Sequence, residues 1–196
     1  MSTVDAKLVK ELRDKTNAGM MECKAALTEA KGNLEEAEVV LRKKLGISAS
    51  KKAGRDAKEG IIASYIHMGG KVGVLLEVNC ETDFVAKNDN FRDFVKDITL
   101  QIAAANPQYV RREEVPQDLV DKEKEIAADQ VKGKPENVIE KIVSGKIDKF
   151  LAGICLLEQP YIKDQNMTIE QMVKVKIGEI GENIVIRRFT RYSVGE

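Results

Sequence analysis

Residues 72–88 read V-G-V-L-L-E-V-N-C-E-T-D-F-V-A-K-N, and this stretch decides the fold. Its apolar residues recur with period two, which predicts a strand with one face packed inward: Val72, Val74, Leu76, Val78 and Cys80. Asn88 suits the N-cap of a following helix. The apolar residues of that helix then follow at helical spacing: Phe91, Phe94, Val95, Ile98 and Ile102. Between the strand and the helix we expect a short exposed turn, which carries an aromatic side chain beside a carboxylate.

The sequence around this stretch predicts a small sheet and several helices. Residues 61–67 and 71–80 flank the turn Gly69-Gly70, which predicts a β-hairpin. The β-branched residues 184–186 predict a last strand over 183–194. Helices are expected over residues 88–106, 117–132 and 135–144, in a short piece over 147–151, and after a capping box formed by Thr168 and Gln171. Because the helices are clustered and do not alternate strictly with strands, the predicted class is α+β.

The first 45 residues predict a separate unit of three short helices. A turn is expected at Asn17-Ala18-Gly19, a helix end at Gly32 and an N-cap at Asn33. The apolar stripes that would form its core are Leu8, Val9 and Leu12; Met20, Met21, Cys23, Ala26 and Leu27; and Ala37, Val40, Leu41 and Leu45. The predicted domains are therefore this bundle (1–45), a basic linker (46–59), and an α+β core (60–196) with a helical segment at 117–151.

Charge gives little support for nucleic-acid binding. The chain has 32 Lys and Arg residues and 32 Asp and Glu residues, so its net charge is zero. The linker is rich in small and basic residues, and it is either a solvated hinge or a contact strip for an acidic partner. An alternative function is an RNA-associated scaffold that uses its four cations: Lys51, Lys52, Arg55 and Lys58.

The sequence contains no recognisable catalytic or cofactor motif. It has neither a Walker loop nor a G-x-G-x-x-G motif, and its single histidine, His67, has no Ser or Cys nucleophile beside it in sequence. Cys23, Cys80 and Cys155 are far apart and lack a C-x-x-C spacing, which predicts structural thiols in a reducing compartment. We expect no enzyme activity, cofactor or metal. The start lacks a secretion signal and no uncharged run approaches membrane length, so we expect a cytoplasmic protein without a membrane span.

Two sets of apolar residues have two interpretations each. Phe84 could be a core side chain folded under the sheet, which the pattern alone favours, or an exposed aromatic finger with Asp83 beside it to recruit a hydrogen-bond donor. Met20 and Met21 have helical spacing typical of a core. Adjacent residues on a helix face different directions, however, so at least one of the two is expected to point outward.

Two long motifs resemble a known family. Residues 12–27, L-R-D-K-T-N-A-G-M-M-E-C-K-A-A-L, and residues 77–86, E-V-N-C-E-T-D-F-V-A, resemble the two signatures of bacterial translation elongation factor Ts. Residues 133–135, 159–160 and 177–184 also fit, so the resemblance covers nearly the whole chain.

The resemblance implies a guanine-nucleotide exchange factor that binds elongation factor Tu and acts without covalent chemistry. It implies that the N-terminal bundle is similar to a ubiquitin-associated domain. By the same resemblance, Thr82, Asp83, Phe84 and Val85 would push into the GTPase domain of the partner and help to dislodge its magnesium ion. Arg13, Met20 and Met21 would dock on that domain. Short members of the family imply a homodimer paired through the sheet, which agrees with the exposed edges expected for three strands. No direct binding of nucleic acid is expected.

The chain departs from the family pattern at three positions. Asn17 stands where Gly is usual, and Asn tolerates the left-handed conformation of such a turn. Tyr161 replaces a more usual Phe, and Gly153 lies where an acidic residue is common, which leaves that contact open. The last strand has no cysteine, so a disulfide across it is excluded.

Overall fold

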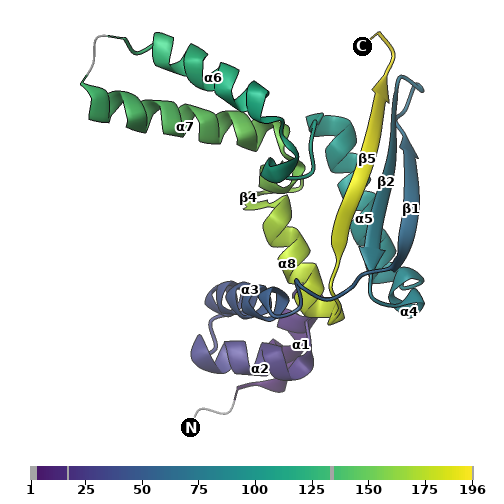
Figure 1. Ribbon diagram of the computed structural model, residues 1–196. Coiled ribbons are helices and arrows are strands. Elements are labelled where there is room, and N and C mark those ends of the chain that lie inside the picture. Colours follow the sequence, from purple (N-terminus) through teal and green to yellow (C-terminus); the bar gives the residue numbers. More distant parts are fainter. Residues whose placement is uncertain (1–3, 17, 133–134, 196) are drawn as a thin grey trace. The chain divides into compact units, whose positions relative to one another are not determined.

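The computed structural model describes residues 4–16, 18–132 and 135–195 and combines helices with two small sheets (Figure 1). The α+β class predicted from the sequence is confirmed. In chain order the elements are α1 (Ala6–Thr16), α2 (Met20–Glu29), α3 (Leu34–Ser50), β1 (Glu59–Ile66), β2 (Val72–Cys80), α4 (Asp83–Ala86), α5 (Asp89–Ala105), η1 (Arg112–Glu114), α6 (Gln117–Asp129), α7 (Glu136–Ile154), η2 (Leu156–Glu158), β3 (Pro160–Tyr161), β4 (Asp164–Thr168), α8 (Ile169–Ile180) and β5 (Val185–Ser193).

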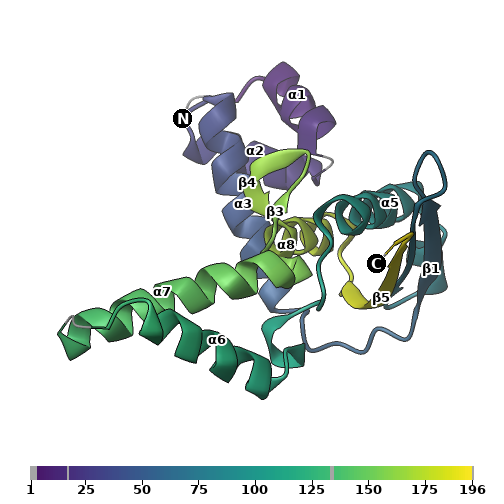
Figure 2. The same ribbon diagram turned by 90° about the horizontal axis from the view of Figure 1, so that it is seen from above.

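The N-terminal residues form the expected three-helix bundle, α1 to α3 (Figure 2). Asn33 begins α3 as predicted, since its side chain accepts hydrogen bonds from the backbone N–H groups of Glu35 and Glu36 at 3.0 and 3.2 Å. The predicted turn residue Asn17 lies outside the described residues. The buried core of the bundle is Val9, Leu12, Ala18, Cys23, Ala26, Leu27, Ala30, Ala37, Leu41 and Leu45.

Helix α3 is longer than the sequence indicated. It continues to Ser50, so residues 46–50 are helical although they were expected to begin a linker. Leu45 and Ala49 are both 2 % exposed, and burial of these two side chains stabilises the helix beyond Gly46.

The described chain divides into two compact units, each made of several segments of the sequence. One unit combines the N-terminal segment through Ile61 with Val78–Phe94 and Gln171–Val185. The other combines Ile62–Glu77, Val95–Glu170 and the segment from Ile186 onward. The predicted domain boundaries stay predictions.

Strands β1, β2 and β5 form an antiparallel sheet in the order β1-β2-β5. The hairpin is confirmed: the His67 N–H donates to the Val72 carbonyl at 2.8 Å, and Gly69 and Gly70 have φ of +90° and +70°. Gly60 is required in β1, because its φ is +144° and a Cβ there would lie 2.2 Å from the Val78 carbonyl oxygen. The expected alternation of β2 is also present, with Val74, Leu76, Val78 and Cys80 buried.

Helix α5 begins as the sequence predicted. The Asn88 side chain accepts a hydrogen bond from the Asn90 N–H at 2.8 Å. The five apolar residues expected on its inner face are all buried: Phe91, Phe94, Val95, Ile98 and Ile102.

Helices α6 and α7 lie side by side and antiparallel (Figures 1 and 2). The prediction that one helix ended near Ser144 and a second covered 147–151 is wrong, because α7 is continuous through Gly145. A glycine inside a helix costs only about 1 kcal/mol. Ile147 and Leu151, which are buried against Val115 and Cys155, outweigh that cost. Gly133, which directly follows the predicted helix 117–132, lies outside the described residues.

Candidate functional site

The turn after β2 is one helical turn, α4, with Thr82 as its N-cap. The Thr82 hydroxyl oxygen accepts a hydrogen bond from the Val85 N–H at 3.4 Å, and the buried Cys80 thiol donates to the Thr82 carbonyl at 3.2 Å. The turn therefore follows directly from a buried strand end and is held at its first residue.

Phe84 points into solvent, with 81 % of its surface exposed. The interpretation favoured by the pattern alone, a core phenylalanine, is wrong. The reason is geometric: Phe84 is the second residue of a one-turn helix, and Ala86, which is 7 % exposed, is the residue of that turn that packs inward. Val85 is half-buried.

Asp83 already has a hydrogen-bond donor within the chain. Its carboxylate accepts from the Lys87 ammonium at 2.7 Å, four residues later in sequence. This hydrogen bond and the positive charge of Lys87 lower the pKa of Asp83. The carboxylate beside Phe84 is therefore ionised and partnered by an exposed lysine that a binding partner could displace.

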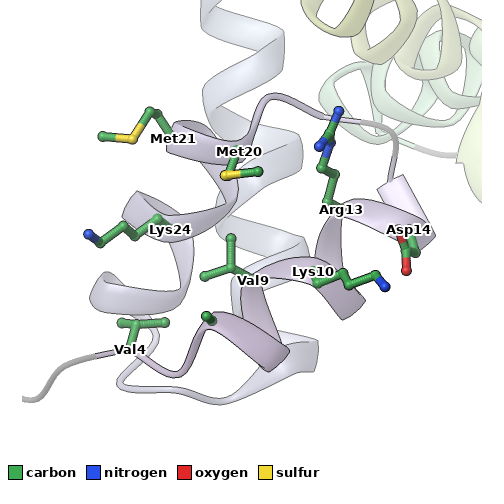
Figure 3. Close-up of a pocket in the computed structure, with 9 residues that line it drawn as sticks. Val4, Val9, Lys10, Arg13, Asp14, Met20, Met21 and Lys24 are labelled. Atoms are coloured by element: carbon green, nitrogen blue, oxygen red, sulfur yellow. The ribbon is translucent and has the colours of Figure 1, made fainter.

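The other predicted contact residues line a pocket on the N-terminal bundle (Figure 3). Met20 and Met21 are 58 % and 74 % exposed, so both methionines point outward rather than into the core. Arg13 lies on the same pocket, which measures about 490 Å³. Figure 3 shows Met20 beside Val9, with Lys24 and Arg13 on opposite sides. The full lining is Val4, Ala6, Val9, Lys10, Arg13, Asp14, Met20, Met21 and Lys24.

The lining of the pocket combines apolar side chains with an excess of basic ones. The lining includes three cations, Lys10, Arg13 and Lys24, and one carboxylate, Asp14. Exposed methionines adapt their shape to a bound surface. Such a pocket suits an apolar side chain flanked by acidic groups.

The thiols and the histidine are not arranged for chemistry. All three cysteines are buried and unbridged, as the sequence predicted. Burial raises the pKa of Cys80 and of Cys155 to about 11, so neither is a thiolate at neutral pH. His67 is exposed and shares a hydrogen bond of 2.9 Å with the Tyr65 hydroxyl. Over the described ranges no group of three or more His, Cys, Asp and Glu side chains could hold a metal ion.

Two of the four linker cations contact carboxylates. Lys58 lies 2.9 Å from Asp56, and Arg55 lies 3.6 Å from Glu81. The scaffold hypothesis stays a prediction without a specific observation in its favour.

Similarity to known proteins covers the whole length of the chain. The family model described as Elongation factor TS matches residues 2–196. The chain belongs to the elongation factor Ts family. It is 60 % identical over 195 residues to elongation factor Ts of Alkaliphilus oremlandii, and this match covers 98 % of the present chain and 90 % of that protein. It is 59 % identical over 196 residues to elongation factor Ts of Geobacter sulfurreducens, and this match covers 99 % of the present chain and 91 % of that protein. For elongation factor Ts of Carboxydothermus hydrogenoformans the identity is 55 % over 195 residues, with 98 % and 90 % covered.

Membership in the elongation factor Ts family confirms the resemblance drawn from the two motifs. Among the helices that the structure describes, none is long and apolar enough to cross a membrane. Two residues that hydrogen-bond to the segment just before α4 were not predicted to do so. Glu182 lay only within a family motif, and Asn183 lay within that motif and at the start of the predicted last strand. No periodicity in the sequence links either residue to a turn that lies 100 residues earlier.

Proposed function

We propose that this chain binds elongation factor Tu carrying GDP and promotes release of the nucleotide, so that the GTPase can be reloaded during translation. The observation that carries this proposal is Phe84, a large apolar side chain that is 81 % exposed on a capped turn in a member of the elongation factor Ts family. Exposed aromatic residues on firmly held loops are frequent anchors of protein interfaces.

The proposed mechanism is a wedge. A nucleoside diphosphate is held in a GTPase largely by contacts to its phosphates and by a bridging Mg²⁺ ion. Entry of Phe84, flanked by Thr82, Asp83 and Val85, would move the elements that hold this ion and weaken the nucleotide. The coupling is reciprocal, so bound GDP must weaken binding of the exchange factor by the same factor. No covalent bond forms or breaks, and acid–base machinery is not needed.

A second contact would come from the N-terminal bundle. The pocket around Arg13, Met20 and Met21 is lined by apolar side chains and has an excess of positive charge. The matching surface on the GTPase would present an apolar side chain among carboxylates. This contact would hold the two proteins together while the wedge acts.

We also propose self-association through the sheet. Several large apolar side chains on β1, β2 and β5 are exposed: Ile62 (66 %), Ile66 (67 %), Leu75 (53 %) and Tyr192 (76 %). A patch of this kind, rimmed by the Arg188–Glu77 ion pair, suits pairing with a second copy. Sedimentation velocity over a range of concentrations should show a dimer that Ile66→Lys weakens. A monomer at all concentrations would reject this part of the proposal.

The central experiment measures release of fluorescent GDP from elongation factor Tu. The wild-type chain should accelerate release, and Phe84→Ala should abolish most of the acceleration while leaving the thermal unfolding temperature almost unchanged. A buried phenylalanine would instead cost about 3–5 kcal/mol of stability on truncation. Ile47→Ala serves as a matched control, since Ile47 is also a large apolar side chain with most of its surface exposed (63 %) but lies in α3, outside the proposed wedge. Absence of acceleration by the wild-type chain would reject exchange activity.

A further inference from the structure

Glu182 contacts the residues that precede the exposed Phe84 turn. Its Oε2 accepts hydrogen bonds from the backbone N–H of Glu81 at 3.1 Å and of Thr82 at 3.0 Å. Its Oε1 accepts from the Thr82 hydroxyl at 2.6 Å. One carboxylate therefore receives three hydrogen bonds from two adjacent residues. Hydrogen bonds to an ionised acceptor are about twice as strong as neutral ones.

The contact is reciprocal. Glu81 Oε1 accepts from the Asn183 backbone N–H at 2.6 Å, and the Asn183 side-chain amide donates to the Arg55 carbonyl at 2.8 Å. Asn183 is only 3 % exposed. Gly181, with φ of +89°, makes the turn that brings Glu182 and Asn183 to this position. The segment between α8 and β5 and the segment after β2 therefore each accept hydrogen bonds that the other donates.

These bonds hold the residues from which the Phe84 turn begins. The exposed ring has little packing of its own, so its direction is set by the backbone of α4. That backbone begins at Thr82, whose hydroxyl accepts from the Val85 N–H and donates to Glu182. Glu182 fixes the orientation of this hydroxyl and the two backbone N–H groups before the helix. Without Glu182, two N–H groups and the hydroxyl would each need another partner.

We propose that Glu182 is a positioning residue for the Phe84 wedge: it holds α4 in the binding-competent geometry before the partner arrives. This inference rests on the exchange activity proposed above. Pre-ordering a contact segment avoids the conformational-entropy cost of ordering it on binding. Glu182 itself is half-buried and acts through Thr82 rather than by touching the partner.

Two variants separate this role from general stabilisation. Glu182→Gln has the same shape but places an NH₂ group where the carboxylate accepts a hydrogen bond. Glu158→Gln is the matched control, because Glu158 also accepts two charge-assisted hydrogen bonds, from Arg112, at a place remote in sequence from α4. Both changes should lower the unfolding temperature to a similar extent. Only Glu182→Gln should slow GDP release at sub-saturating exchange factor, by about tenfold, as expected for loss of a bond to a charged group that orders the contact segment before binding.

The positioning role predicts non-additivity. In a Phe84→Ala background, Glu182→Gln should change the GDP release rate by less than about twofold, since the wedge tip that it positions is already absent. Full additivity of the two changes would overturn the inference. Equal loss of release rate in Glu182→Gln and Glu158→Gln would also overturn it.

A second measurement does not depend on exchange activity. Backbone hydrogen exchange of the free chain should be about tenfold faster for residues 82–87 in Glu182→Gln and unchanged in the middle of α5. If the wild-type chain fails to release GDP, the exchange proposal is rejected, and the hydrogen-exchange result still decides whether Glu182 orders the turn. Unchanged protection of residues 82–87 in Glu182→Gln would reject the positioning role itself.

Discussion

Gly178 of α8 lies against Leu45 of α3 so closely that a Cβ at position 178 would be 2.7 Å from the Leu45 Cβ and 3.1 Å from its Cα. Leu45 is 2 % exposed, and the bundle core that it belongs to also packs against Val175 of α8. The absence of a side chain at Gly178 is therefore what allows α8 to dock on the bundle.

Gly178→Ala should destabilise the chain. Alanine raises helix propensity by about 1 kcal/mol relative to glycine. Overpacking against a core costs about 1–3 kcal/mol, and here the clash includes backbone rather than the mobile end of a side chain. We expect the clash to dominate, and urea unfolding measures the difference. Gly145→Ala is the matched control, since it also lies inside a helix but has nothing within 4 Å, and it should stabilise the chain by about 0.5–1 kcal/mol. A stabilising Gly178→Ala would contradict the close packing.

Met21→Ala should weaken binding to elongation factor Tu without destabilising the bundle. Met21 is 74 % exposed, so its truncation should change the unfolding free energy by less than about 0.5 kcal/mol. An interface anchor would cost more than about 1 kcal/mol of binding free energy, which is a factor of five or more in Kd. Isothermal titration against the nucleotide-free GTPase measures it.

Leu12→Ala provides the contrasting control for that measurement. Leu12 is 0 % exposed in the same bundle, and its truncation should cost about 2–5 kcal/mol of stability. Equal stability losses for Met21→Ala and Leu12→Ala would show that the methionine is part of the core.

The buried thiols predict a loss of stability at alkaline pH. Burial raises the folded-state pKa of Cys80 and of Cys155 from the ordinary value of 9.0 to about 11. Because the folded state holds these protons more tightly, their contribution to stability is fully present below pH 9 and is lost as the pH rises toward 11. The free energy of unfolding should therefore fall between pH 9 and 11, and Cys80→Ala should reduce the slope in this range.

Thiol labelling tests the same shift directly. At pH 9 only roughly 1 % of a thiol with a pKa near 11 is thiolate, compared with half of an unfolded one. Ellman's reagent should react slowly with the folded chain and rapidly with all three cysteines in denaturant. Fast stoichiometric reaction of Cys80 and Cys155 in the folded chain at pH 8 would contradict the burial.

Local signals in the sequence predicted most of the elements, because a strand alternation or an N-cap depends on neighbouring residues. The inward face of β2, the N-caps at Asn33 and Asn88, and the glycine hairpin were all correct for this reason. The α3 and α7 ends were wrong because tertiary burial of residues such as Leu45 and Ile147 outweighs the low helix propensity of Gly46 and Gly145.

The candidate site was predicted only in part. The period of β2 located the turn, but period alone could not decide whether Phe84 faces the core or solvent, since a one-turn helix follows the strand. The contact between Thr82 and Glu182 spans 100 residues, and no local pattern encodes it. A contact between residues so far apart in sequence is found only from the three-dimensional structure.

Arg112→Lys should loosen the base of the helical hairpin formed by α6 and α7. The guanidinium donates two hydrogen bonds to Glu158, one of them at 2.6 Å, and a third to Asp148 of α7 at 2.8 Å. These carboxylates raise the pKa of Arg112 above its ordinary value. Lysine keeps the charge but cannot donate to both oxygens of Glu158 in the same fork geometry. Since these side chains are partly exposed, we expect the substitution to lower the free energy of unfolding by about 1 kcal/mol, and this effect should shrink in 1 M salt.

Lys132→Met is the control. It breaks an ion pair with Asp129 whose side chains are 74 % and 68 % exposed, so it should leave the free energy of unfolding nearly unchanged. The measurement is urea unfolding at low and high NaCl, because the denaturant guanidinium chloride is a salt and would itself screen the charges. If the loss of stability did not depend on salt, Arg112 would act through packing of the apolar part of its side chain rather than through its charge.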